Sequence, residues 1–145
     1  MNKLVFLIIT GVAIVIVSCN SGCSSGNSDR PKTTEELKME IKIKEQSTPT
    51  KYLTVTGRKM YYNSDADRWV VEGMINNSAT VAKFKDIVLL IQLFSQTGTV
   101  IGQEEYIIYK FSEPNSSIPF SIKFFNHPDD TKNYFVLVKN ATAVN

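Results

Sequence analysis

Hydrophobic and polar residues follow distinct patterns along this chain, and each pattern predicts a different kind of segment. Residues 4–17 form an unbroken, uncharged run of fourteen residues directly after Lys3. This length and flanking charge are typical of a signal-peptide h-region, because a membrane-spanning helix needs roughly 20 apolar residues. Residues 20–32 then carry Ser, Gly and Asn with no large apolar side chain, and such a segment cannot bury enough surface to fold. The pattern therefore predicts a signal peptide followed by a flexible tether.

Residues 33–45 have more than one interpretation. Their four apolar side chains alternate with charged residues, and a period of two residues is the signature of a strand. Thr33 and Glu36 instead have the spacing of a helix capping box, which would place Leu37 and Ile41 on one helical face. We favour the strand, while a helix and an exposed charged linker stay open.

From residue 51 onward, runs rich in β-branched and aromatic residues alternate with turn sequences. The predicted strands are residues 51–62, 68–76, 84–95, 100–111, 118–125 and 133–144. Clusters of Asn, Asp, Ser, Gly and Pro separate them, as expected for turns between strands. The sequence therefore predicts an all-β fold, an antiparallel β-sandwich of about seven strands.

Two of these predicted strands indicate where the core lies. In residues 68–76, Trp69, Val71 and Ile75 share one face, because side chains alternate along a strand. We expect this face to point into the core. Residues 84–95 are the most apolar stretch after the signal, which predicts a central strand.

The end of the first apolar run carries a further motif. In Ile16-Val17-Ser18-Cys19, aliphatic residues and a small residue precede a cysteine, and this motif resembles the lipobox of bacterial lipoproteins. The resemblance implies that Cys19 receives a diacylglyceryl group with acyl chains such as palmitate, and that cleavage after Ser18 makes Cys19 the first mature residue. Such chains would hold the protein on a membrane of the bacterial cell envelope almost permanently. Cys23 is a second candidate with polar residues before it, and an uncleaved anchor and a plain secretory peptide also stay open.

Domain organisation, charge and cysteine positions agree with one modest exported domain. The predicted segments are a signal peptide (residues 1–18), a tether with an N-terminal segment (19–50) and a β-sandwich domain (51–145). Without Lys3, fifteen Lys and Arg residues face fourteen Asp and Glu residues, a net charge of +1. We therefore expect no nucleic-acid partner, since such binders carry a basic face or tract. Both cysteines precede the domain, so no disulfide or cysteine metal site is expected in it.

Three elements of the predicted strands and turns carry a family resemblance. They are Trp69-x-Val71-x-Gly73-x-Ile75-Asn76-Asn77, the apolar run that closes at Leu93-Phe94-Ser95 with Gly98 behind it, and Pro114-Asn115-Ser116-Ser117 before Phe120. Over residues 52–143 this succession resembles the FxLYD domain of bacterial exported proteins, although Leu93-Phe94-Ser95 replaces Leu-Tyr-Asp and Asn115 stands where Gly is usual. The resemblance implies an immunoglobulin-like β-sandwich with a non-catalytic role. Within it, we expect Gly73 to let backbones approach, Asn76 to cap the turn and Gly98 to supply a positive φ.

Candidate catalytic groups are scarce in the sequence. His127 is the single histidine, and we expect it to be a solvated turn residue before Pro128. Glu104 and Glu105 cannot act as an acid–base pair, because neighbours on a strand point to opposite faces. The sequence therefore predicts no enzyme and no cofactor.

Two acidic turn sequences are the candidates for a metal site. Asp129-Asp130 offers two adjacent carboxylates, and Asn63-x-Asp65-x-Asp67 begins like a calcium loop. In the second of these, Arg68 and Met74 stand where a calcium loop needs glycine and glutamate, and adjacent acids in a turn that contains proline are usually solvated. We expect both to be solvated turns, with no metal bound.

The function that we expect is a lipid-anchored interaction module of the cell envelope. Lys132 and Lys139 punctuate the last predicted strand, as in edge strands kept soluble by charge. Such an edge can recruit an extended segment of a protein partner through main-chain hydrogen bonds. The membrane leaflet and the surface exposure stay open.

The alternative is a carbohydrate- or small-ligand-binding lipoprotein. Tyr61, Tyr62, Tyr106 and Tyr109 are the candidate stacking residues for a glycan. Core packing explains these tyrosines about as well.

Overall fold

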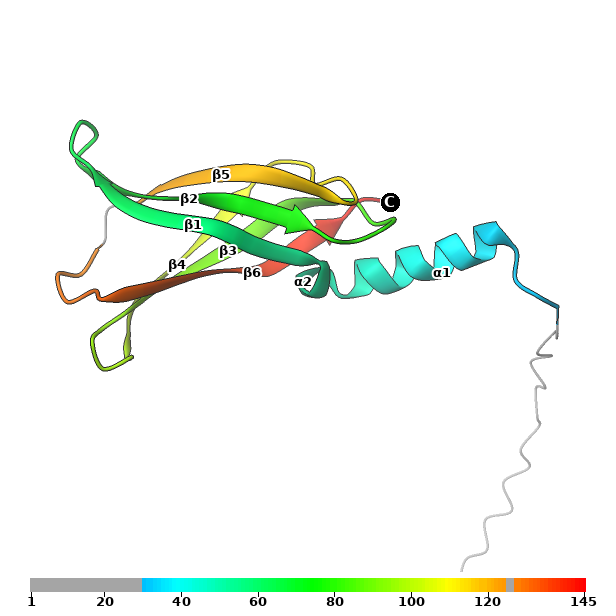
Figure 1. The fold of residues 1–145 in the computed structure, drawn as a ribbon, viewed down its shortest axis with the longest axis horizontal. Coiled ribbons are helices and arrows are strands. Elements are labelled where there is room, and N and C mark those ends of the chain that lie inside the picture. The colour runs from blue at the N-terminus through cyan, green and yellow to red at the C-terminus, as the bar shows by residue number, and fades with distance from the viewer. Residues whose placement is uncertain (1–29, 125–126) are drawn as a thin grey trace, which may run out of the picture. The chain divides into compact units, whose positions relative to one another are not determined.

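Two three-stranded antiparallel sheets form the fold in the computed structural model, which describes residues 30–124 and 127–145 (Figure 1). The strands are β1 (Leu53–Asn63), β2 (Arg68–Asn77), β3 (Phe84–Phe94), β4 (Val100–Ile108), β5 (Ser116–Phe124) and β6 (Asn133–Ala143). One sheet has the order β1-β2-β5, and the other has the order β4-β3-β6. The predicted all-β antiparallel sandwich is therefore confirmed.

The strand connectivity is that of a Greek key. β1 with β2 and β3 with β4 are hairpins, whereas β2 pairs with β5 and β3 pairs with β6 across long stretches of sequence. These two pairings match the B–E and C–F pairs of immunoglobulin-like sandwiches. The described residues therefore form a reduced version of that architecture.

Two helices, α1 (Thr34–Ser47) and α2 (Pro49–Tyr52), precede the sandwich. The strand favoured for residues 33–45 is therefore wrong, and six strands form within the described residues instead of about seven. Lys32–Asn145 form one compact unit, so α1 belongs to the same body as the sheets.

The capping box is the feature that decides the conformation of α1. The Thr33 hydroxyl accepts a hydrogen bond from the Glu36 N–H at 3.3 Å, and the Glu36 carboxylate accepts one from the Thr33 N–H at 2.8 Å. Glu35 and Glu36 lie in the first turn and Lys44 in the last, which is the favourable arrangement for the helix dipole. The apolar side chains of α1 are 42–60% exposed, so their alternation reflects no buried sheet face.

The core lies between the inner faces of the two sheets. Val71 and Ile75 of β2 face Ile87 and Leu89 of β3, and all four are completely buried. This confirms the predicted core face of residues 68–76 and the central position of residues 84–95. β3 alternates buried and half-buried side chains along its whole length, as expected for a strand with one face in the core.

The two long sides of the sandwich differ. The edge strands β1 and β6 contact each other along one side, and no comparable contact joins the described strands β4 and β5 along the other. Figure 1 also shows that the turns between β1 and β2, between β3 and β4 and before β6 lie at the end opposite α1.

Three expectations about individual residues have different outcomes. Gly98 has a φ of +81°, as predicted. A Cβ on Gly73 would lie 2.9 Å from the Phe120 ring and 3.0 Å from the Thr56 carbonyl oxygen, so close approach does require glycine there. Asn76 does not cap the turn after β2, because its side chain bonds to Thr56 and Ser117 on the neighbouring strands. Asn77 caps this turn instead, since its side-chain oxygen accepts from the Ala79 N–H.

Candidate interaction surfaces

The outer face of the β4-β3-β6 sheet carries an apolar patch. We call it the outer patch; its members are Leu90, Phe94, Ile107, Phe135 and Leu137. Ile107, Phe135 and Leu137 are 40–47% exposed. Leu90 lies directly opposite Leu137 in the register, and the Phe94 and Phe135 rings meet edge to face at 5.5 Å. Gln92 lies on the same face between Leu90 and Phe94, opposite Phe135, and bonds to Gln103. Exposed apolar side chains gathered on one face are typical of an interaction surface.

Charged and polar side chains lie beside and between the members of the outer patch. The Arg58 guanidinium lies over the Phe135 ring, 5.4 Å from its centroid, which is a cation–π arrangement. Lys139 of β6 forms an ion pair with Glu105 of β4 across the face of the sheet. Glu105 lies directly opposite Leu90 in the register, so this ion pair crosses the outer patch itself.

The outer face of the other sheet has a different composition. Its exposed or half-buried residues include the polar residues Lys59, Glu72, Ser117, Ser121 and Lys123, together with Tyr61, Met74 and Pro119. Because the two outer faces are built on the same kind of strand pairing, the apolar character of the β4-β3-β6 face is a property of its sequence and not of the fold.

β6 lies at an edge of its sheet, where the sequence predicted an edge strand. Of its two predicted lysines, Lys139 pairs with Glu105, whereas Lys132 precedes the strand and its N–H donates to the Phe94 carbonyl. The unpaired side of β6 faces β1. The freer edge on this sheet is therefore β4, on the open side of the sandwich.

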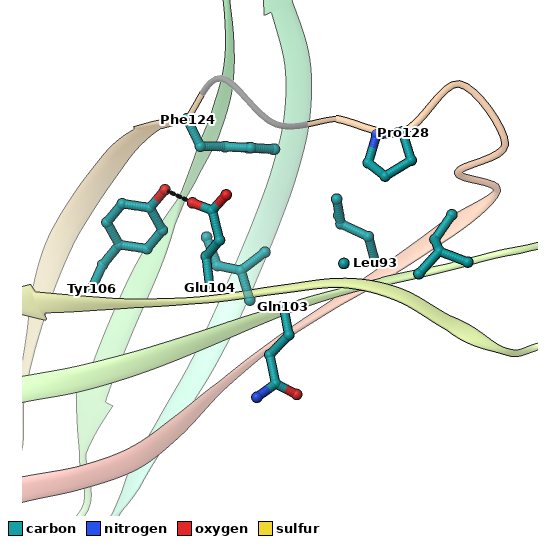
Figure 2. A pocket seen from close by; sticks show the side chains of 9 residues that line it. Leu93, Gln103, Glu104, Tyr106, Phe124 and Pro128 are labelled. Carbon is teal, nitrogen blue, oxygen red and sulfur yellow. Dashed lines mark hydrogen bonds between the residues drawn. The ribbon is translucent and has the colours of Figure 1, made fainter.

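A small pocket lies on this open side, between β4 and the side chains of Phe124 and Pro128 (Figure 2). Its volume is about 80 Å³. Glu104 and Tyr106 point into the space between the sheets, and the Tyr106 hydroxyl donates a hydrogen bond to the Glu104 carboxylate. The remaining walls are mostly apolar: Ile91, Leu93, Ile101, Phe124 and Pro128.

Glu104 and Glu105 point to opposite faces of β4, as predicted from strand geometry. Glu104 is opposite the buried Ile91 in the register and shares the inner face, whereas Glu105 pairs with Lys139 on the outer face. Burial is the main cause that raises the pKa of the Tyr106 hydroxyl, and the hydrogen bond to Glu104 and its negative charge raise it further. Tyr106 is therefore protonated and serves as a donor.

A buried carboxylate connects α1 to the loop between β2 and β3. Glu45 accepts hydrogen bonds from the N–H groups of Thr80, Val81 and Ala82 and from the Thr80 hydroxyl, at 2.8–2.9 Å. The Gln46 side chain adds a hydrogen bond to the Val144 carbonyl. Sequence reasoning missed Glu45, because it stands in a run of charged residues and its partners lie 35–37 positions away.

His127 is not the solvated turn residue that the sequence predicted. Its ring stacks on Trp69 with a centroid distance of 3.8 Å and an interplanar angle of 12°, and Phe124 lies 6.4 Å away. The flat imidazole therefore covers one face of the indole ring. Burial lowers the pKa of His127, against a smaller opposing effect of its backbone hydrogen bond and of the Asp129 charge.

The structure does not gather the four candidate tyrosines into one platform. Tyr61 donates to Glu72 and Tyr62 to Asp67 on one sheet, whereas Tyr106 lies in the pocket of the other. Tyr109 is 77% exposed. Within the described residues no ring contact joins any two of these tyrosines, and the glycan hypothesis stays a prediction.

One of the two metal candidates, Asn63-x-Asp65-x-Asp67, forms hydrogen bonds within its own turn. The Asn63 side chain accepts hydrogen bonds from the N–H groups of Asp65 and Ala66, and Asp67 accepts from Tyr62. In the part of the chain that the structure describes, no group of three or more His, Cys, Asp or Glu residues could hold a metal ion.

The predicted lipidation site lies outside the described residues. Cys19, Cys23, the signal peptide and most of the tether precede residue 30, and Phe125, the predicted end of a strand, is not described either. Across residues 30–124 and 127–145, no helix has the length and apolar character needed to cross a membrane.

Comparisons with protein-family models, with curated proteins and with solved structures find no match for this chain. The lipobox and FxLYD resemblances therefore stay predictions.

Proposed function

We propose that this chain is a lipid-anchored lipoprotein of the bacterial cell envelope whose FxLYD-like β-sandwich is a non-catalytic, protein-binding domain. The outer patch is the observation that supports a binding role. It presents Ile107, Phe135 and Leu137 to solvent, on a sheet whose counterpart has a more polar outer face. Burial of apolar surface is the main favourable term in most protein association.

The N-terminal part of the structure supports an anchored arrangement. α1 contains 14 residues and so extends about 21 Å at 1.5 Å per residue. Glu45 fixes the last turn of this helix to the loop after β2. In a protein anchored at Cys19, the helix would lie as a stiff segment between the tether and the sandwich.

Site-specific crosslinking in native membranes tests this proposal. A photo-reactive amino acid would replace Leu137 in the outer patch or, as the matched control, Ser121 on the polar outer face. We expect one abundant protein to crosslink from position 137 and not from position 121, and the yield to fall in Cys19→Ala. The purified partner should then bind Leu137→Lys at least about tenfold more weakly than the wild type, with little change for Ser121→Lys.

Three results would contradict parts of the proposal. Identical crosslinks from both positions would exclude the outer patch as the specific binding surface. Equal partner affinity for Leu137→Lys and the wild type would do the same. If Cys19 does not incorporate radiolabelled palmitate in a bacterial host, the proposed lipid anchor is excluded.

A carbohydrate- or small-ligand-binding role is the second candidate, and the exposed ring of Tyr109 is the observation that favours it. Stacking on exposed aromatic rings is a common way to bind flat apolar faces of ligands. A glycan array probed with the wild type and with Tyr109→Ala tests this role. Binding by the wild type that is lost in the variant supports it, whereas no binding of the wild type above background excludes it.

A further inference from the structure

The open side of the sandwich holds a carboxylate that points between the two sheets. Glu104 lies on the inner face of β4, opposite the buried Ile91. Figure 2 shows its side chain below the Phe124 ring and beside Tyr106. Leu93 and Phe124 on the pocket walls are themselves buried. A charged group therefore stands among apolar side chains at a place where solvent or a ligand can reach it.

The hydrogen-bonding capacity of Glu104 is only partly used. A carboxylate has about four acceptor positions, and the Tyr106 hydroxyl fills one of them. No lysine or arginine among the described residues forms an ion pair with Glu104. Acceptor positions that face an apolar pocket are best matched by a positively charged donor, because charge-assisted hydrogen bonds are the stronger ones.

The size of the pocket restricts the ligand to a small group. One water molecule needs about 10–15 Å³ of such volume, so the 80 Å³ of this pocket accommodates a ligand of a few non-hydrogen atoms. Gly102 contributes no side chain to this wall, and a Cβ at this position would lie 3.2 Å from the Leu93 side chain. An ammonium group on a short aliphatic stem fits both the volume and the chemistry of the walls.

We propose that this pocket binds a primary ammonium group carried on a short aliphatic stem. Glu104 accepts hydrogen bonds from the ammonium group, the Tyr106 hydroxyl holds the carboxylate in place, and Ile91, Leu93 and Phe124 contact the stem. The ligand is either a free alkylamine or the lysine side chain of a partner. The edge position of β4 leaves room for a partner strand that would deliver such a side chain.

Titration of the full-length lipidated protein in detergent micelles tests this proposal. The readout is the methyl NMR shifts of Ile91, Leu93 and Ile101, and the probe is n-butylammonium, with n-butanol and butyrate as neutral and anionic controls. We expect saturable shifts with butylammonium, and binding at least about tenfold weaker for butanol. Butyrate should cause no saturable shift.

Variants of the two neighbouring glutamates distinguish the effect of the pocket carboxylate on binding from the effect of general surface charge. Glu104→Gln should weaken butylammonium binding by at least about tenfold, whereas Glu105→Gln on the outer face should leave it unchanged. Equal binding of butanol and butylammonium by the wild type would overturn the proposal even if Glu104→Gln failed to fold. The proposal would also be overturned if Glu104→Gln bound butylammonium as tightly as the wild type but aggregated faster. The carboxylate would then serve only to protect the edge strand from aggregation.

A peptide distinguishes the two sources of the ammonium group. The probe is an extended, acetylated strand peptide with one central lysine, and its control carries norleucine at that position. Binding at least about tenfold tighter than butylammonium, with shifts of the β4 amides, identifies a partner's lysine; affinity no better than that of butylammonium identifies a free amine. Leu137→Lys should leave butylammonium binding unchanged, so this site and the outer patch can fail independently.

Discussion

The Glu45 carboxylate of α1 accepts a hydrogen bond from the backbone N–H of Ala82 at 2.8 Å. The N–H groups of Thr80 and Val81 point at the same carboxylate, which is only 3% exposed. Successive backbone N–H groups that converge on an anion form a nest. Here the anion belongs to the same chain, so the nest fixes the end of α1 onto the sandwich.

Replacement of Glu45 by glutamine should loosen this attachment. An amide has one oxygen acceptor, and its NH₂ group would face N–H donors, so buried donors would lose their partner at a cost of about 2 kcal/mol. We expect faster hydrogen exchange in residues 34–47 and at Val81 and Ala82, measured by mass spectrometry. Glu40→Gln, which changes an exposed residue of the same helix, is the control and should leave exchange at Val81 and Ala82 unchanged.

Acid should reproduce the effect of this substitution. Burial by itself raises the pKa of Glu45, but the hydrogen bonds from Thr80, Ala82 and Val81 outweigh it and lower the pKa below 4.5. The stabilisation is therefore complete above the ordinary pKa and is lost as the pH falls through the lowered value. Protection of α1 that was independent of pH down to complete acid unfolding would contradict this account.

Asn77 is the polar centre of the end of the sandwich nearest α1. Its amide donates to the carbonyls of Ala82, Ser112 and Glu113, and its side-chain oxygen accepts from the Ala79 N–H. Asn77→Asp has the same shape but no donor, and it would place a charge against carbonyl oxygens. We expect a loss of about 3–5 kcal/mol in the free energy of unfolding, measured by urea denaturation.

Asn76→Asp is the matched control for this prediction. The Asn76 side chain lies on the exposed outer face, where it bonds to Thr56 and Ser117, so water can replace what is lost. We expect a change below about 1 kcal/mol. Similar losses of unfolding free energy at the two positions would show that the buried hydrogen bonds of Asn77 stabilise the fold no more than the exposed ones of Asn76.

Gly73→Ala should destabilise the sandwich because the space above Gly73 is occupied. The new Cβ would lie 2.9 Å from the Phe120 ring and 3.0 Å from the Thr56 carbonyl oxygen, and a backbone atom cannot easily move. We expect a loss of about 1–3 kcal/mol in the free energy of unfolding. Gly102→Ala is the control, since the three atoms nearest to its Cβ would all belong to the Leu93 side chain, at 3.2–3.6 Å, and none of them is a backbone atom. Equal losses in both variants would exclude the Phe120 contact as the cause.

The sequence allowed prediction of the strands because their alternation reflects a real division between core and solvent. Val71 and Ile75 are buried as the pattern of residues 68–76 predicts. The same rule failed for α1, where Met39 and Ile43 alternate with charged residues but remain exposed. Periodicity identifies a strand only when one face is buried, and the sequence alone does not show which faces are buried.

The groups of the candidate sites were harder to predict, because their partners are remote in sequence. Glu45 meets residues 80–82, and Asn77 meets Ser112 and Glu113. Glu104 was placed correctly on the opposite face from Glu105, but its position in a pocket depends on Phe124 and Pro128 from the far side of the sandwich. Such neighbours follow from the packing of the two sheets and not from local pattern.

His127 and Trp69 form a pair that can be observed directly, because the chain has one histidine and one tryptophan. Their rings stack at 3.8 Å, and a protonated imidazole at this distance quenches indole fluorescence. Burial lowers the pKa of His127 from 6.5. We therefore expect Trp69 emission to fall on acidification with a midpoint below pH 6.5, and this step to be absent in His127→Gln.

The same shift has a consequence for stability with a definite sign. Between the lowered pKa of the folded state and the ordinary value of 6.5, the unfolded chain binds the proton more readily, so the free energy of unfolding rises with pH in this window. Asp129 raises the pKa of His127 through its charge, so Asp129→Asn should move the fluorescence midpoint to lower pH. A wild-type midpoint at or above pH 6.5, or an unchanged pH response in His127→Gln, would show that burial against Trp69 does not control this histidine.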